Sequence, residues 1–465
     1  MKKLVLAAAL LPLAVNSQID LGTPIATGKG GVSTAITHDW QCLGINPANL
    51  GFDDNYKFSF GLTNFGFSLQ SKAIDLTRLS NAVLHPNDKF TLPEKQELAT
   101  KFATPDGMNL YANVNWFAAS IYFPKLGGIA LNVRDRISGH ATLGKNTSDI
   151  IFNGVKSVPY QDPSVYSKYL SDVLDGTHIS YYHYRELNLA YGRKIIGTDE
   201  TVQLFGGVGA KYLWGLGDMD FKSENGQISG RAAFSTDYGF KYDQVKNYKP
   251  TTTNSYFNTV GHGFAFDMGT AIKIKNKFTV AASVTDVGSI TWAKNTLIVI
   301  DTTMPHLDTS QVGLSSFDAN SIAGFLYNSL TSMVHYSDAG AYTTVLPTRL
   351  RLGTGLKLGK KVLIGCDAVM PISENKGDLQ NAFFALGGEV NLWGTAKFST
   401  GISGNQNYGF SVPVGFTLGT LGITEFYVAT NDIITFISKS KNPQLSFCMA
   451  VFRFNLKKPG ENVAK

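Results

Sequence analysis

The amino-acid sequence predicts an all-β fold, a transmembrane antiparallel β-barrel of about 14 strands. The prediction rests on three observations: an export signal at the N-terminus, many segments in which apolar and polar residues alternate, and no later apolar run long enough for a transmembrane helix. The composition agrees, because 47 of the 465 residues are Gly and only 16% are charged. Barrel strands give such a composition, since they need be apolar on one face only.

Residues 1–17 have the form of a cleavable signal peptide. Lys2 and Lys3 precede an apolar run that is too short to span a bilayer, and the compact residues Val15 and Ser17 follow it. We therefore expect export and residence in the cell outer membrane. Without the two lysines the formal charge falls from +6 to +4, which is too small for a chain of this length to favour nucleic acid binding.

The cysteines and histidines do not predict a metal site. Cys42, Cys366 and Cys448 are far apart and lack the spacing of metal ligands, so we interpret them as small apolar side chains. His178 and His183 are five positions apart, which would place them on opposite faces of a strand. The sequence also lacks a nucleophile and base in a catalytic arrangement. We expect no metal, no cofactor and no catalytic residue.

The barrel strands follow from alternation with a period of two residues. From Phe264 to Ile274 nearly every even position is apolar, while Asp267 and Lys273 lie on the other face. In the first strand the apolar face changes from even to odd positions near Thr63, which predicts a bulge there. The predicted strands are 57–70, 108–123, 127–143, 178–194, 201–215, 263–275, 278–290, 347–358, 361–371, 381–392, 394–404, 408–419, 423–435 and 444–456.

The connections between these strands support the barrel topology. Short turns follow every second strand, whereas long connections follow the others, at 71–107, 144–177, 216–262 and 291–346. Outer-membrane barrels have this asymmetry, with short periplasmic turns and long outer loops. An even number of strands requires that the strand-like residues 226–243 form a hairpin above the membrane. The barrel then covers residues 56–457, and residues 458–465 form a short polar tail.

Residues 18–55 precede the first strand, and we expect them to form a plug inside the barrel, because residues 27–36 are too small and polar for a wall strand. Pro47 disfavours helix at Asn46, and the Asn side chains of this turn can bond its own backbone. A Gly-rich segment that leads to Asn-Pro-Ala and then to the first strand resembles the N-terminal hatch of the FadL family of outer-membrane transporters. The resemblance is carried by Gly28, Gly30, Gly31, Asn46, Pro47, Ala48 and Asn49.

The resemblance implies passive uptake of hydrophobic small molecules, such as long-chain fatty acids or aromatic compounds, by a protein embedded in outer-membrane lipid. In that family the ligand is caught between outer loops, moves to a site beside the hatch and leaves through a side opening in the wall. The sequence also looks like that of a divergent barrel from Bacteroidota, where some relatives serve type IX secretion. An accessory barrel that binds exported proteins or a secretion complex is therefore the alternative function, and an outer-membrane enzyme is the least expected one.

The inward positions of the predicted strands carry charges of both signs, which argues against a strongly charge-selective pore. Two roles are open for these charges. They either form hydrogen-bonded pairs that brace the wall and hold the plug, or recognise an acidic head group on the ligand. The residues considered for ligand or hatch contacts are Arg134, Arg136, Arg349, Arg351 and Glu389.

Two of the long connections contain predicted helices. Thr91 is a suitable N-cap and Pro93 fits the first turn of a helix over residues 91–103. Apolar residues recur at helical spacing over residues 320–334. Such helices either form a capture groove for an apolar ligand or pack together to close the barrel mouth. The groove would be lined by Ile322, Phe325, Leu326, Leu330 and Met333.

Overall fold

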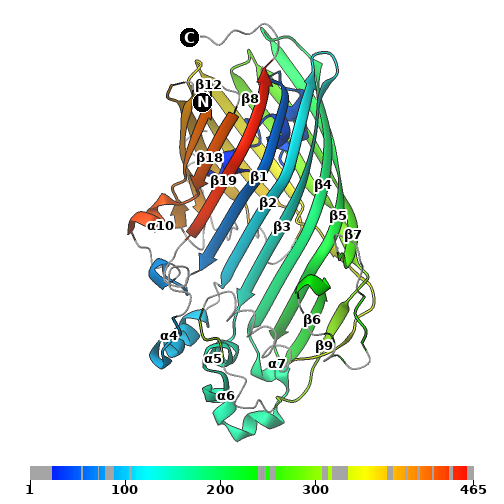
Figure 1. The fold of residues 1–465 in the computed structure, drawn as a ribbon, viewed down its shortest axis with the longest axis vertical. Coiled ribbons are helices and arrows are strands. Elements are labelled where there is room, and N and C mark those ends of the chain that lie inside the picture. The colour runs from blue at the N-terminus through cyan, green and yellow to red at the C-terminus, as the bar shows by residue number, and fades with distance from the viewer. Residues whose placement is uncertain are drawn as a thin grey trace, which may run out of the picture.

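The computed structural model describes residues 23–53, 56–71, 73–78, 88–103, 107–238, 242, 245, 248–251, 258–305, 313–316, 334–373, 381–393, 395–405, 409–420, 424–438 and 444–457. These residues form a closed antiparallel β-barrel of 14 strands. Figure 1 shows the tilted strands, with the first strand, β1, beside the last, β19.

The barrel closes on itself because the first strand, β1, pairs with both β2 and the last strand, β19. The wall strands described are β1 (Tyr56–Ser71), β2 (Met108–Phe123), β3 (Gly127–Thr142), β4 (Thr177–Ile196), β5 (Val202–Glu224), β7 (Gly261–Ile274), β8 (Phe278–Trp292), β12 (Arg349–Leu358), β13 (Val362–Pro371), β14 (Phe383–Asn391), β15 (Ala396–Asn405), β17 (Val414–Thr420), β18 (Thr424–Thr430) and β19 (Gln444–Lys457).

Short strands extend this wall on the side of the long connections. They are β6 (Gln227–Phe234), β9 (Thr296–Ile300), β10 (His335–Asp338), β11 (Tyr342–Val345) and β16 (Gly409–Ser411). β6 pairs with the end of β5 and with β9, and β9 pairs with β10, so these strands form a sheet beyond the barrel. β6 is therefore not a wall strand. This agrees with the prediction that residues 226–243 lie above the membrane, which followed from an even number of wall strands.

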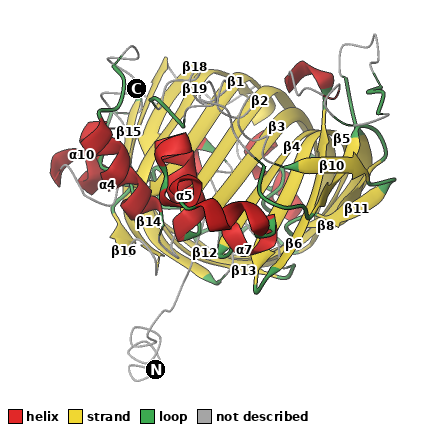
Figure 2. Cartoon of the chain, turned by 90° about the horizontal axis from the view of Figure 1, so that it is seen from below, coloured by secondary structure: helices red, strands yellow, loops and turns green. Residues whose placement is uncertain are grey.

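Helices gather at the same end of the barrel. Figure 2 shows α4, α5 and α7 together at the end seen from below, with α10 at the rim. The helices are α2 (Pro24–Thr27), α4 (Leu92–Phe102), α5 (Lys145–Asn153), α6 (Val158–Gln161), α7 (Leu170–Val173) and α10 (Ile433–Ser438), with the 3-10 turns η1 (Asp39–Cys42), η2 (Pro47–Gly51), η3 (Gly154–Lys156), η4 (Pro163–Ser167) and η5 (Thr236–Tyr238). Within the described residues, no helix combines the length and hydropathy needed to cross a bilayer.

The alternation predicted from the sequence is present in the wall. On β7, Phe264, Phe266 and Met268 are 62%, 58% and 66% exposed, whereas Ala265 and Asp267 between them are 0% and 3% exposed. The exposed set faces outward, where a lipid bilayer would cover it, and the buried set faces the lumen. The apolar and polar faces therefore have the orientation of an outer-membrane barrel.

Most predicted elements are confirmed. Most wall strands begin and end near the predicted residues, but β5 continues to Glu224, well past its predicted end at residue 215. The helix α4 begins with the predicted Thr91 cap, whose hydroxyl accepts a hydrogen bond from the Glu94 amide. Thr63 has a φ of 44°, and the exposed positions of β1 change from even to odd there, as predicted. The register of β1 with β2 and β19 does not shift at this residue, so the predicted bulge is not present in the strand pairing. The predicted signal peptide, the polar tail and the capture groove from Ile322 to Met333 lie outside the described residues.

Two other predicted strands are wrong in part. Segment 408–419 is not one strand, because Val412 and Pro413 separate β16 from β17. Segment 423–435 stops being a strand at Thr430, because the Asp432 carboxylate accepts the Thr435 amide at 2.9 Å and caps α10. Both corrections fall in the same part of the wall.

Candidate functional site

The N-terminal segment, residues 23–53, lies against the inward faces of the wall strands. Asn46 holds its turn, because its Oδ1 accepts from the Ala48 amide at 3.1 Å while its Nδ2 donates to Thr34 O at 3.3 Å and to Thr270 O of β7 at 3.2 Å. Asn49 Nδ2 donates to Thr34 O and Thr37 O at 3.0 and 2.9 Å. The Asn-Pro-Ala-Asn turn thus fixes the segment to itself and to the wall.

Glycines on neighbouring wall strands make room for this turn. A Cβ on Gly269 of β7 would lie 1.9 Å from Asn46 Oδ1, and a Cβ on Gly207 of β5 would lie 2.3 Å from the Pro47 carbonyl carbon. Gly128 and Gly192 contact the same turn from β3 and β4. No side chain fits at such distances, so the close approach of wall and segment requires glycine.

Ion pairs and hydrogen bonds anchor the segment at further points. Asp367 of β13 accepts from the Ser33 and Thr34 amides at 2.9 and 2.8 Å. Asp39 pairs with Arg453 of β19, and Lys29 lies 3.6 Å from Glu389 of β14. Two further luminal groups join these anchors, since Arg453 also pairs with Glu425, which lies 3.4 Å from Lys397. The Asp367 and Arg453 side chains are buried, whereas the Lys397 side chain is 29% exposed, so most of these contacts are shielded from water.

A second group of charges forms a buried layer across β3, β4, β5, β7 and β8. Arg134 Nε donates to Glu186 at 2.9 Å, and Arg136 Nη1 donates to Asp286 at 2.9 Å. Lys211 Nζ donates to Asp267 at 2.8 Å and also to Asp286. The layer holds three positive and three negative groups, so its charges balance.

These contacts bear on the two roles considered for the luminal charges. Arg134, Arg136 and Glu389 each pair with an opposite charge of the protein, which supports the bracing role. Arg349 and Arg351 are also buried, at 2% and 3% exposure, on β12. Recognition of an acidic head group by these residues stays a prediction.

On the outer side of the charged layer lies a cavity of about 400 Å³. Successive inward positions of β4 and β5 build its wall, because the strand register pairs Tyr182 with Asp218 and Ser180 with Asp220. Tyr184 connects it to the charged layer, since the Arg136 guanidinium lies 5.7 Å from the centre of that ring. The cavity is lined by His178, Ser180, Tyr181, Tyr182, Tyr184, Asp218, Met219, Asp220, Lys222, Ile290, Trp292, Thr344, Val345, Leu346 and Pro347.

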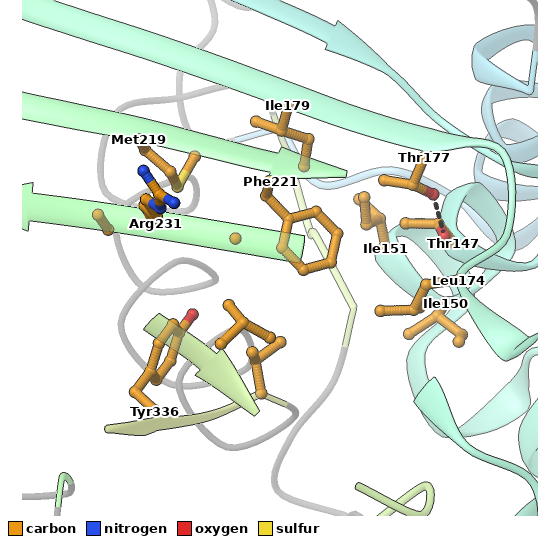
Figure 3. Close-up of a pocket in the computed structure, with 14 residues that line it drawn as sticks. Thr147, Ile150, Ile151, Leu174, Thr177, Ile179, Met219, Phe221, Arg231 and Tyr336 are labelled. Carbon is orange, nitrogen blue, oxygen red and sulfur yellow. Dashed lines mark hydrogen bonds between the residues drawn. The ribbon is translucent and has the colours of Figure 1, made fainter. Parts of the chain in front are cut away.

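A smaller pocket, of about 50 Å³, lies on the other face of the β4–β5 extension (Figure 3). Ile179 of β4 and Phe221 of β5 face Ile150 and Ile151 of α5 and Leu174, which follows α7. Apart from the Thr147 and Thr177 hydroxyls and Arg231, its lining is chiefly aliphatic and aromatic side chains. The outer helices thus cover an apolar surface.

The wall is interrupted on the outer side between β16 and β19. β18 ends at Thr430, and polar side chains replace strand pairing from there on. Asn431 Nδ2 donates to Ser411 Oγ of β16 at 3.0 Å, and its amide donates to Ser446 Oγ of β19 at 2.6 Å. Asp432 accepts from the Val412 amide at 3.1 Å. Among the described residues, the strand ladder is thus replaced beside α10 by these side-chain contacts and by a backbone hydrogen bond from the Ile433 amide to Val412 O at 2.9 Å.

Two luminal carboxylates, Asp286 of the charged layer and Asp218 of the cavity, were not predicted from the sequence. Asp286 lies within a bulge of β8 and has a φ of 61°, which turns an outward position of strict alternation into a luminal one. Asp218 lies beyond the predicted end of β5 at residue 215. The sequence does contain a pattern that predicts this longer strand, because charged residues stand at every second position at Asp218, Asp220 and Lys222.

Several solved structures resemble this chain. A deltaS2S3 mutant of the monoaromatic hydrocarbon channel TodX matches with a TM-score of 0.50 and 11% identity, over 94% of this chain and 99% of that one. The P. putida toluene transporter TodX matches with a TM-score of 0.46 and 10% identity, over 95% and 100%. A Pseudomonas aeruginosa FadL homologue matches with a TM-score of 0.40 and 8% identity, over 95% and 96%.

The fold is therefore similar to that of the TodX mutant, and it is a β-barrel of the type that the sequence predicted. No curated protein sequence matches the chain significantly. Residues 47–433 match the model described as "Family of unknown function (DUF5723)", and the chain belongs to this family.

Proposed function

We propose that the protein is a passive outer-membrane channel for hydrophobic small molecules of the long-chain fatty acid or aromatic type. The observation that carries the proposal is the cavity of about 400 Å³ between the charged layer and the outer strands. Ligand sites are commonly about 300–1,000 Å³ and combine apolar walls with a few polar groups. An apolar cavity of about 150 Å³ already holds benzene in another protein, so an aromatic ring would fit here with room to spare.

The apolar pocket under α5 and α7 supports a capture step outside the lumen. Its open space of about 50 Å³ is too small for a ring, so a ligand would have to separate Phe221 from the helix side chains. Those side chains are aliphatic and make few polar contacts, which lowers the cost of that movement. In this proposal a hydrophobic molecule rests there before it reaches the lumen.

The N-terminal segment would act as the hatch on the periplasmic side of the charged layer. Its many hydrogen bonds to the wall favour a fixed obstacle over a swinging one. A side opening then becomes the natural exit. The interruption between β16 and β19 supports such an opening. In the described part of the chain, hydrogen bonds of residues 431–433 bridge it in place of a strand ladder, and Ile437 of α10 is 76% exposed beside it.

The test is native mass spectrometry, with lipid extraction, on the protein purified from its own outer membrane in mild detergent. Ser180→Trp would fill the cavity from β4, whereas Ser229→Trp, on the exposed face of β6, is the matched control. We expect a co-purifying hydrophobic small molecule in the wild type and in Ser229→Trp, and its loss in Ser180→Trp. A stoichiometric protein partner on a barrel with no small molecule would contradict the proposal and favour the accessory barrel for exported proteins.

A further inference from the structure

Asp218 is a buried carboxyl group that lines the cavity. Among the described residues, no positively charged group forms an ion pair with it. Its side chain is 8% exposed, and its Oδ2 accepts a hydrogen bond from the Tyr342 hydroxyl at 2.9 Å. A buried carboxylate is costly unless a cation or several donors surround it. A ligand with a hydrogen-bond donor or a positive charge could therefore supply the partner that the Asp218 carboxylate needs.

The position of Asp218 is beyond the membrane-spanning part of β5. Tyr212 and Trp214 lie on the outward face with ring centres 4.9 Å apart, as in the aromatic girdles of barrels. From Gly217 onward β5 pairs with β6 instead of β7. Burial raises the pKa of Asp218 to about 7, which agrees with a carboxyl group held away from water.

The other charged groups near the cavity are already engaged. His178 Nε2 lies 2.8 Å from Asp220 Oδ1. Lys222 pairs with Glu224, and the Arg231 guanidinium lies 5.8 Å from the centre of the Tyr342 ring. Asp220 brings a second carboxylate to the same wall, since it follows Asp218 on the inward face of β5.

A hydroxyl at the floor of the cavity adds a further polar group. Tyr184 is 1% exposed, and its hydroxyl has no hydrogen-bond partner among the described residues. Buried hydroxyls are normally bonded, so this one is available to the polar part of a ligand. The cavity thus combines apolar walls with Asp218, Asp220 and a free hydroxyl.

We propose that this cavity selects hydrophobic molecules that carry a hydrogen-bond donor or a positive charge, such as aromatic amines and alcohols, over those that carry a carboxylate. The inference rests on the proposed function and narrows its ligand class. An ammonium or hydroxyl group would donate to Asp218, whereas a carboxylate would meet two carboxylates of like charge. Hydrophobic walls would hold the ring in either case.

The experiment measures, by isothermal titration calorimetry in detergent, the binding of four compounds that share one ring: benzylamine, benzyl alcohol, toluene and benzoate. We expect benzylamine to bind roughly tenfold or more tightly than benzoate, because a hydrogen bond to a charged group is worth at least that factor. Asp218→Asn should remove most of the advantage of benzylamine over toluene, measured as the ratio of their two dissociation constants. Asp172→Asn, which removes a carboxylate of α7 outside the cavity, should change neither.

The outcomes separate the two proposals. If toluene binds but benzylamine and benzoate bind equally, or if Asp218→Asn leaves their ratio unchanged, this inference is overturned and the channel proposal stands. If none of the four compounds binds, this inference is overturned, and the co-purification experiment decides on the channel proposal. Heat-dependent migration of each variant on a gel verifies that its barrel is folded, so that a loss of binding is not a loss of fold.

Discussion

Asn46 of the N-terminal segment packs directly on Gly269 of β7, so closely that a methyl group on this glycine would lie 1.9 Å from the Asn46 side-chain oxygen. The neighbouring carbonyl, that of Thr270, accepts from the same Asn side chain at 3.2 Å. Wall and segment are therefore fitted to each other at this point. A small substitution in the wall at this position should show how much the tight fit contributes to stability.

Replacement of Gly269 by Ala should destabilise the protein, because the added methyl group would push Asn46 out of its hydrogen bonds. Overpacking of this kind costs about 1–3 kcal/mol. Gly209→Ala on β5 is the control, since its Cβ would meet its nearest neighbours at 3.4 Å, an ordinary contact distance. Folded and unfolded barrels migrate differently on a gel, so the unfolding temperature can be read from samples heated before electrophoresis. This temperature should fall for Gly269→Ala and not for Gly209→Ala. Equal behaviour of the two would show that the segment yields easily.

The pair formed by Asp39 and Arg453 should be energetically coupled. Arg453→Met leaves Asp39 as a buried carboxylate without its partner, and such losses cost about 3–5 kcal/mol. The double variant with Asp39→Asn should be less destabilised than the sum of the two single variants. Urea unfolding in a double-mutant cycle measures the coupling. Strict additivity would mean that the contact contributes nothing specific.

Binding of benzylamine should depend on pH through Asp218. The raised pKa, about 7, means that this carboxyl is neutral below that pH and charged above it. The affinity for benzylamine should therefore increase from about pH 6 to about pH 8, while that for toluene should stay constant. Other ionisable groups also face this region, namely His178, Asp220, Lys222 and Arg231. Measuring the affinity for benzylamine over the same pH range in Asp218→Asn separates the contribution of Asp218 from theirs. A pH dependence that persists in this variant belongs to another group.

The interruption of the wall should open more readily when α10 loses its cap. Asp432→Ala removes the acceptor of the Val412 amide and of the Thr435 amide. Loss of an N-cap costs about 1 kcal/mol. We expect faster release of bound ligand and faster proteolysis within α10, measured by ligand exchange and by limited digestion. Ser229→Ala on β6 is the control, and an unchanged release rate in Asp432→Ala would place the exit elsewhere.

The barrel itself could be predicted from the sequence because its two faces meet different surroundings. Lipid-facing and lumen-facing residues alternate along every wall strand, and this pattern is local in the sequence. The interruption beside α10 was missed although its signals were present. Pro413 cannot donate to a strand ladder, and Asp432 three residues before Thr435 has the spacing of a helix cap.

The candidate site was harder to predict because it depends on irregular backbone and on the far ends of strands. Asp286 reaches the charged layer only through a bulge, which reverses the parity of the positions after it. Asp218 becomes buried only because β5 continues past the membrane and pairs with β6. The partner of each charge is also invisible in the sequence, since Arg136 and Asp286 are 150 positions apart.

Asp39 and Arg453 are 414 positions apart, and their contact joins the segment that precedes the first strand to the strand that closes the barrel. It cannot form until nearly the whole chain has been synthesised and the seam between β1 and β19 has closed. A barrel that closed around an empty lumen would bury Arg453 and Glu425 without Asp39. Closure of the barrel and seating of the N-terminal segment are therefore coupled, because the strand that seals the wall carries the partner of Asp39.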